Sequence, residues 1–356
     1  MRAEGPRTVQ VIAHSRPTLE ADDEQAVLAV LRSGHIAQGA QVAAFEDQVA
    51  RYVGVHGGVA TSSGTAALHL ALLALGVQPG DEVAMPSYVC TAPLYATQYL
   101  GAVPLLVDID PVSYNIDAAD LQRKCTRRTK AVIVPHLFGL PAALEALLAL
   151  GLPIVEDCAQ ALGATYDGRP VGSFGALAIC SFYATKVLTT GEGGMVLSRT
   201  ADYLEEARQR RDYDEKAPSL LRYNYKMTDL QAALGVTQLG KLPRFVQHRQ
   251  ALAAHYTRRL QAYGMAAPAV PARCSHIFYR FVVQVQRDLE ALLERLAAAG
   301  ITCRRPVFRP LHHYLRQFAC PVTDQVWQRA LSLPIYPTLS VDAVDRVVDR
   351  VVESLT

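Results

Sequence analysis

The sequence predicts an α/β protein with a large domain, built on a mostly parallel central sheet flanked by helices, and a smaller α+β domain at its C-terminal end. Short apolar runs alternate with stretches of helical length through the first two thirds of the chain, which is typical of βαβ units and a buried parallel sheet. This alternation ends after Gly235. A chain of 356 residues, 50% hydrophobic, is long enough for one large core and a smaller second one.

The expected strands of the large domain are short apolar runs, several of them bounded by Gly, Pro or Asp. We predict them at residues 82–85, 103–108, 131–135, 153–156 and 176–182. A helix is expected at residues 67–75, ending at Gly76. Ligands of such sheets collect at the carboxyl ends of the strands, so polar residues at those ends are the first candidates for a site.

The small domain is expected after a connecting helix. Apolar residues recur near helical spacing over residues 239–263, with Pro243 in the first turn. A strand is predicted at residues 278–285, a helix at 289–299 stopped by Gly300, and a terminal amphipathic helix at 341–355. We therefore divide the chain into residues 1–240, with an N-terminal segment that can pack on the small domain, and residues 241–356.

Composition excludes several classes of protein. The formal net charge of +2 is too small for a nucleic-acid binder. Seven cysteines without a CxxC pair favour neither a disulfide framework nor a zinc cluster, so no metal is expected and a reducing cytoplasm fits best. Because no apolar run approaches the length of a membrane span, we expect a soluble protein with no membrane partner.

Lys186 is the candidate nucleophile. It lies between the predicted strand at 176–182 and the glycine-rich turn Gly191–Gly194, so its amine can be presented at the end of a strand. A lysine held there can form a Schiff base with a carbonyl cofactor. An isolated lysine beside a turn is usually a surface residue, so the assignment depends on the residues around it.

Three groups of residues support that chemistry. Gly64, Thr65 and Ala66 follow a run of small hydroxyl residues and open a helix, where backbone N–H groups can bind a phosphate, although the same pattern suits an ordinary helix cap. Asp157 ends an apolar strand, where it can pair with a pyridinium nitrogen or, alternatively, cap a helix. Ser181 precedes Lys186 by five residues, at the end of its strand. Together they favour a site for pyridoxal phosphate.

These motifs resemble the DegT/DnrJ/EryC1/StrS family of pyridoxal-phosphate-dependent sugar aminotransferases, which have the fold type I transferase architecture. The likeness extends over nearly the whole chain. It includes the segments 33–46, 63–69, 79–83, 156–160, 181–186, 224–231 and 331–337.

The resemblance implies a role for each matching position. Lys186 matches the lysine that holds the cofactor and then moves a proton, Asp157 the partner of the pyridine nitrogen, and Gln160 a residue beside the ring. Gly64, Thr65, Ala66 and Ser181 match the phosphate site. Asn224 matches an asparagine that reaches the phosphate from the partner subunit, which implies a homodimer with shared active sites.

One position departs from the family pattern. Many relatives have an aromatic residue stacked on the cofactor ring where this chain has Cys90, so either the thiol covers the ring or Tyr88 takes over by a small shift. The substrate region is harder to identify. Residues 304–314 combine cations and aromatics in an expected loop, a composition that suits a phosphate-bearing sugar and equally suits a surface loop.

The resemblance implies a transaminase that uses pyridoxal 5′-phosphate, with pyridoxamine 5′-phosphate as the intermediate form. It would move an amino group, from glutamate, to a keto group of a nucleotide-linked deoxysugar; an aminocyclitol acceptor also remains open. One alternative is the sugar 3-dehydratase branch of the family, which has histidine where this chain has Lys186. Another is a non-catalytic regulatory protein that binds the cofactor.

Overall fold

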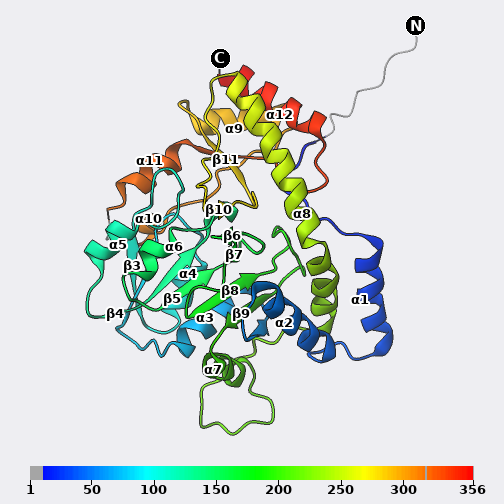
Figure 1. The fold of residues 1–356 in the computed structure, drawn as a ribbon, viewed down its shortest axis with the longest axis vertical. Helices are drawn as coiled ribbons and strands as arrows, with labels where there is room; N and C mark the ends of the chain where they lie inside the picture. The colour runs from blue at the N-terminus through cyan, green and yellow to red at the C-terminus, as the bar shows by residue number, and fades with distance from the viewer. Residues whose placement is uncertain (1–10, 317–318, 356) are drawn as a thin grey trace.

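A seven-stranded sheet forms the centre of the molecule, in the order β1-β9-β8-β5-β4-β2-β3 (Figure 1). The computed structural model describes residues 11–316 and 319–355. Only β9 runs antiparallel to its neighbours, so the predicted mostly parallel α/β fold is confirmed. The strands are β1 Gly57–Thr61, β2 Glu82–Pro86, β3 Val103–Val107, β4 Thr129–Pro135, β5 Ile154–Asp157, β8 Leu177–Ser181 and β9 Gly194–Ser198.

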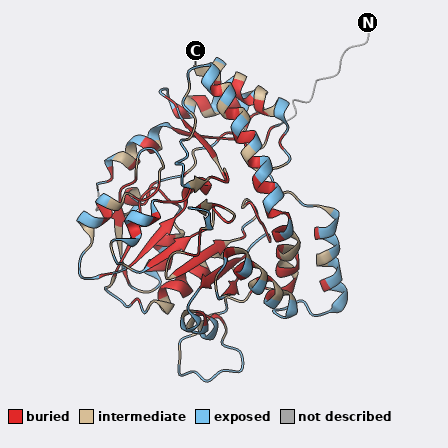
Figure 2. Cartoon of the chain, viewed as in Figure 1, coloured by how far each residue is buried: buried red, intermediate tan, exposed pale blue. Residues whose placement is uncertain are grey.

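Both faces of this sheet are covered, and successive residues of one strand contribute to different cores. Along β8, Ile179 belongs to the core beneath α3, whereas Ala178 and Cys180 belong to the core beneath α2. Figure 2 shows the sheet buried along its length. The helices of this part are α2 Ala40–Val53, α3 Gly64–Ala74, α4 Ala92–Gln98, α5 Ala118–Lys124, α6 Leu144–Leu148 and α7 Ala201–Arg211.

The connecting helix α8 differs from its prediction. It spans Asp229–Ala262, so the predicted start at residue 239 and the placement of Pro243 in the first turn are wrong. The helix begins at a capping box, in which Thr228 accepts from the N–H of Gln231 and the Gln231 side chain accepts from that of Thr228. Pro243 lies in the helix interior, and the expected division at residue 240 falls inside one continuous helix.

The C-terminal part has a second core. Strand β11 Phe281–Gln284 pairs antiparallel with β12 Ala330–Leu333. Their apolar residues pack with α9 Leu289–Ala298, α12 Val341–Leu355 and the second half of α8. Ile12, from the other end of the chain, joins this core and forms a parallel bridge with Ile301.

Shorter elements complete the description. Helix α1 Ala21–Ser33 lies along α8, and α10 Leu311–Leu315 and α11 Pro321–Arg329 precede β12. The two-residue strands are β6 Thr165–Tyr166, β7 Arg169–Pro170 and β10 Cys274–Ser275, and η1 Leu137–Gly139 is a single 3₁₀ turn. Among the described residues, no helix combines the length and the apolar character that crossing a bilayer requires.

Candidate active site

The candidate phosphate site lies where α3, β8 and β9 approach one another very closely. A Cβ on Gly64 would lie 2.8 Å from the Cβ of Ser181, and one on Gly194 would lie 2.3 Å from the carbonyl oxygen of Ser63. Neither position has room for a side chain. The two glycines therefore bring the end of β8 against the first turn of α3.

The first turn of α3 provides N–H groups for an anion. Ser63 caps the helix, its Oγ accepting from the N–H of Ala66 at 3.1 Å. The N–H groups of Gly64 and Thr65 precede any intrahelical partner, and the helix dipole adds to the attraction for negative charge. Because both residues are only half-buried, this turn can receive a phosphate next to Ser181.

Asp157 lies at the carboxyl end of β5, 7% exposed. It does not cap a helix, because the following residues form turns; its Oδ1 accepts from the N–H of Ala159 at 3.0 Å. Burial raises the pKa of this carboxyl group, and the Ala159 N–H and the charge of Lys186 oppose the rise only in part. A buried carboxylate with this balance favours a cation beside it, as a protonated pyridine nitrogen would be.

Lys186 is half-buried in the turn after β8. Its Nζ lies 5.1 Å from the ring centroid of Tyr279, whose hydroxyl is 3.2 Å from the Thr185 hydroxyl. Burial alone would raise the pKa of Tyr279, but the charges of Lys186 and Arg280 outweigh it and the pKa is lowered. The charge of Lys186, the predicted nucleophile, also acts on Asp157, the predicted pyridinium partner.

Cys90 and Tyr88 occupy different environments. Tyr88 is fully buried, and its ring packs edge-on against Tyr114 and Phe138. Cys90 is exposed, although the protein around it removes enough hydration to raise the thiol pKa, and Asp157 contributes to the rise. Cys90 is therefore the one with access to a ligand beside Asp157.

Gln160 and Asn224 are held differently. The Oε1 of Gln160 accepts from the N–H of Phe138 at 2.9 Å, which fixes its side chain beside the turn after β4. Asn224 is exposed. The next residue, Tyr225, accepts at its carbonyl from the N–H of Ser62 at 2.7 Å, so the Asn224 segment runs past the phosphate site while its own side chain faces outward.

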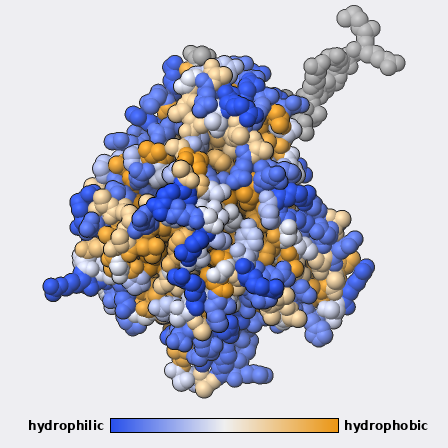
Figure 3. Space-filling view, in the orientation of Figure 1, coloured by the Kyte–Doolittle hydropathy of each residue, from blue (hydrophilic) through white to orange (hydrophobic). Residues whose placement is uncertain are grey.

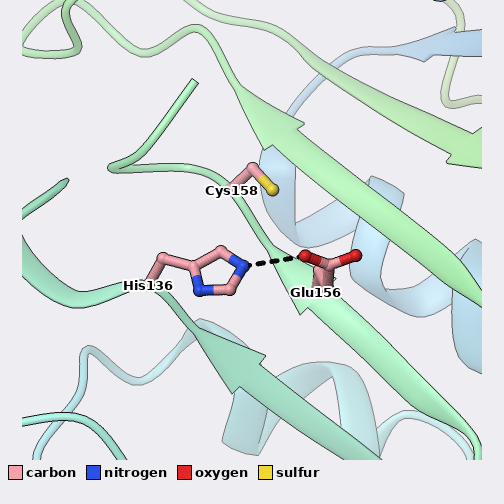
Figure 4. A group of neighbouring side chains, drawn as sticks. All are labelled: His136, Glu156 and Cys158. Carbon is pink, nitrogen blue, oxygen red and sulfur yellow. Dashed lines mark hydrogen bonds and ion pairs between the residues drawn. The ribbon is translucent and has the colours of Figure 1, made fainter. Parts of the chain in front are cut away.

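Sequence reasoning missed the residues that support Asp157. His136 Nε2 lies 3.0 Å from Glu156, and its Nδ1 accepts from the N–H of Ala142 (Figure 4). Glu156 also accepts from the N–H groups of Gly172, Phe174 and Gly175. Both ring nitrogens of His136 and both carboxylate oxygens of Glu156 therefore form hydrogen bonds within the protein. We interpret this group, which has Cys158 nearby, as a structural support for β5 and not as a metal site. A charged residue inside an apolar strand was its only sequence signal.

A second group of possible metal ligands is likewise hydrogen-bonded. His312 Nδ1 lies 2.6 Å from the Ser87 hydroxyl, and the Nε2 atoms of His312 and His313 both approach Asp324. These contacts tie α10 and α11 to the loop after β2.

A lysine and a buried carboxylate at one end of a mostly parallel sheet, beside a helix turn that can receive an anion, are the arrangement that a pyridoxal-phosphate-dependent transferase requires. The chain belongs to the DegT/DnrJ/EryC1/StrS aminotransferase family, whose model matches residues 17–352. It is therefore an aminotransferase, with pyridoxal phosphate as its cofactor.

Relatives agree with this assignment. GDP-perosamine synthase of Caulobacter vibrioides is 34% identical, over 95% of this chain and 96% of its own. UDP-N-acetyl-3-dehydro-α-D-glucosamine 3-aminotransferase of Acidithiobacillus ferrooxidans is 36% identical over 87% of both chains. The solved structure of a putative sugar aminotransferase of Streptococcus pneumoniae, in its PMP (pyridoxamine phosphate) form, superposes with a TM-score of 0.91, at 26% identity, over 97% of each chain.

Proposed function

We propose that the protein transfers an amino group from glutamate to a keto group of a nucleotide-linked deoxysugar. The observation that carries the proposal is the placement of Lys186 beside the buried Asp157, next to the helix turn at Gly64. Two relatives named for nucleotide-sugar amination support the acceptor class.

Each residue of the site would have its own role in binding the cofactor or in moving a proton. Pyridoxal phosphate, when bound, supplies an aldehyde that takes up the amino group and a ring that withdraws electrons from the reacting carbon. Gly64, Thr65, Ala66 and Ser181 would hold its phosphate, and Asp157 would keep its ring nitrogen protonated. Lys186 would hold the aldehyde carbon between turnovers and carry the proton between that carbon and the substrate. Cys90 and Gln160 would lie against the ring.

The test follows the colour of the cofactor. Purified protein should be yellow, lose its visible absorbance on adding glutamate, and regain it with a nucleotide-linked keto-sugar. Lys186→Ala should lower the rate of this exchange by about 100- to 10,000-fold, the usual worth of a positioned acid–base group. Colourless wild-type and variant proteins that behave alike would rule out the assignment.

We further propose a cytoplasmic homodimer in which Asn224 completes the phosphate site of the partner subunit. The exposed side chain of Asn224 supports this, as do the exposed apolar residues Leu31 and Ile36. Ile36 also lines an apolar hollow of about 840 Å³ between α1 and residues 34–41. On the face drawn in Figure 3, hydrophobic residues lie in patches among hydrophilic ones. All seven cysteines are free, as expected in a reducing compartment.

Asn224→Ala should weaken cofactor retention without disturbing the fold of the subunit. The measurements are cofactor content after dialysis and the molar mass by light scattering. A wild-type protein that is monomeric and fully active would contradict the shared site.

A further inference from the structure

His69 is a buried histidine of α3, the helix whose first turn provides the candidate phosphate site. Its neighbours in the chain, Leu68 and Leu70, are fully buried in the core beneath α3. The His69 side chain is 2% exposed, and its Nε2 forms no hydrogen bond within the described residues. A buried polar nitrogen without a partner destabilises a fold, so stability alone does not account for a histidine at this position.

The other ring nitrogen of His69 contacts Tyr225. His69 Nδ1 lies 3.1 Å from the hydroxyl of Tyr225, which belongs to the loop before α8. Burial, and then the charge of Arg210, lowers the pKa of His69 to about 4, so the ring is neutral at physiological pH. A neutral imidazole nitrogen either donates or accepts one hydrogen bond, and a tyrosine hydroxyl can match both cases. The contact therefore orients Tyr225 without placing a charge beside it.

Two tyrosines of that loop pack against the His69 ring. The rings of Tyr223 and Tyr225 are stacked, with centroids 5.0 Å apart and an angle of 8° between their planes. Both meet the His69 ring edge-on, at centroid distances of 4.8 and 5.9 Å. Side chains of residues i and i+2 of an extended segment lie on one side, and the residue between them points to the other. Asn224 lies between the two tyrosines and is exposed, so the direction of its side chain follows from theirs.

The backbone of the loop is held on both sides of Asn224. The N–H groups of Tyr223 and Tyr225 donate to carbonyls in the last turn of α7, at 2.8 and 3.0 Å. The carbonyl of Tyr225 accepts from the N–H of Ser62 at 2.7 Å, immediately before the cap of α3. One helix therefore carries the phosphate turn of its own subunit at its first residues and holds the Asn224 loop through His69.

We propose that His69 is a positioning residue, which acts through the Tyr225 hydroxyl to direct Asn224 into the phosphate site of the partner subunit. This inference rests on the proposed shared site, because it is there that Asn224 meets the cofactor. The close approach of Gly64 and Gly194 shapes the phosphate turn of the same subunit without that hydroxyl. Loss of the His69 contact should therefore weaken the partner's active site and spare its own.

The first measurement is the concentration of pyridoxal phosphate that half-saturates the dimer. Tyr225→Phe removes the hydroxyl and keeps the stacked ring, so this concentration should rise by about 3- to 10-fold, the worth of one neutral hydrogen bond. His69→Leu, which has no Nδ1, should act alike. His69→Asn, whose amide can replace Nδ1, should be closer to wild type. Tyr99→Phe is the matched control and should change nothing, because it removes the same hydroxyl from another ring that meets His69, at the end of α4.

Mixed dimers show which active site each change affects. Only a chain with Lys186 turns yellow, so a dimer with one Lys186→Ala chain reports a single site. With Tyr225→Phe in the Lys186→Ala chain, the coloured site receives Asn224 from the altered chain and should bind cofactor about 3- to 10-fold more weakly. With Tyr225→Phe in the opposite chain, the coloured site should bind cofactor as in wild type. A merely structural disturbance of α3 would weaken the coloured site in this second arrangement.

Asn224→Ala in the same two arrangements separates this inference from the proposed shared site. If Asn224→Ala weakens the coloured site only from the Lys186→Ala chain, while Tyr225→Phe and His69→Leu do nothing or act within their own chain, the shared site stands and the positioning role of His69 is overturned. If Asn224→Ala acts equally in both arrangements, the shared site fails and this inference fails with it. Bleaching by glutamate tests the transaminase assignment in either case.

Discussion

At the scale of single residues, Glu156 and Asp157 show how one strand gives two adjacent carboxyl groups opposite properties. Their side chains point to opposite faces of the sheet. Burial would raise the pKa of Glu156, but the hydrogen bonds from His136 and from backbone N–H groups outweigh it and lower the pKa. Asp157 has one N–H donor, and burial raises its pKa. Glu156 is satisfied by the protein, whereas Asp157 is left for a ligand.

Asp157→Asn should therefore affect the cofactor-free and cofactor-bound proteins in opposite directions. A carboxyl group whose pKa is raised on folding costs stability above its folded pKa, and this cost disappears as the pH falls below the unfolded value. Without cofactor, the asparagine variant should melt at a higher temperature than wild type at pH 7, and the difference should vanish near pH 3, below the ordinary aspartate pKa of 3.8. With cofactor, it should bind about 10- to 100-fold more weakly, because the partner of the ring nitrogen is lost.

Glu156→Gln is the matched control for that experiment. An amide cannot accept all the hydrogen bonds that Glu156 accepts, so this variant should be less stable with and without cofactor, by about 3 kcal/mol. Thermal melting at pH 7 and pH 3, with and without cofactor, compares the wild type with the two variants. If Asp157→Asn also destabilised the cofactor-free form, the account of Asp157 as an uncompensated carboxylate would be wrong.

The sequence could identify Asp157, Ser181 and Lys186 because the first two end a strand and the third follows one, each within a short motif. It could not pair His69 with Tyr225, because these residues are far apart in the chain and meet only in the folded protein. Nothing in either local pattern indicates the contact. The assignments of the individual site residues remain predictions until variants are measured.

At the scale of elements, two glycines illustrate where backbone packing determines the site. A Cβ on Gly194 would lie 2.3 Å from the carbonyl oxygen of Ser63 and 2.7 Å from the nitrogen of Gly64, both backbone atoms. Gly194→Ala should push β9 away from α3 and lower cofactor affinity by at least about tenfold. Gly240→Ala, in the interior of α8 with open space around the new Cβ, should instead stabilise the protein by about 0.5–1 kcal/mol.

Titration with pyridoxal phosphate and urea unfolding test this pair. Equal cofactor affinity in Gly194→Ala and wild type would show that the close approach does not shape the site. The comparison is informative because both substitutions add the same methyl group.

Five strands of the central sheet, β2, β3, β4, β5 and β8, could be predicted from the sequence to within a few residues, since short apolar runs report burial. Strand β1, at one edge of the sheet, and β9 beside it were missed, because both begin with glycines that local propensity disfavours in strands and that tertiary contacts require. Thr228 or Asp229 was expected to cap a helix, but the change of pattern after Gly235 and a first-turn interpretation of Pro243 hid the continuity of that helix with the connector. In the structure Gly235 lies against the ring of Phe45, where a Cβ would come within 2.6 Å, so packing against α2 selects glycine in mid-helix.

At the scale of the whole molecule, the core beneath α2 and the C-terminal core are connected by helix α8, and the N-terminal segment adds a residue to the C-terminal core. Helix α8 runs from the core beneath α2 into the C-terminal core, and Ile12 enters that core from the N-terminal segment. The N–H of Ile12 donates to Gly300 and its carbonyl accepts from Thr302, so the first described residues extend the C-terminal part. His14, whose Nε2 lies 2.9 Å from the hydroxyl of Ser332 in β12, follows two residues later.

Ile12→Ala should therefore destabilise the C-terminal core and leave the candidate active site intact. Removing a buried isoleucine side chain costs about 2–5 kcal/mol, and Ile12 is 4% exposed. Hydrogen exchange should accelerate in β11, α9 and α12 and stay unchanged in the central sheet, because that sheet has its own cores. Cofactor content should not fall, because the predicted phosphate turn and Asp157 belong to α3 and the central sheet.

Val11→Ala, at a side chain 67% exposed, should change neither quantity. Uniformly faster exchange in both cores after Ile12→Ala would show instead that α8 couples them into one cooperative unit.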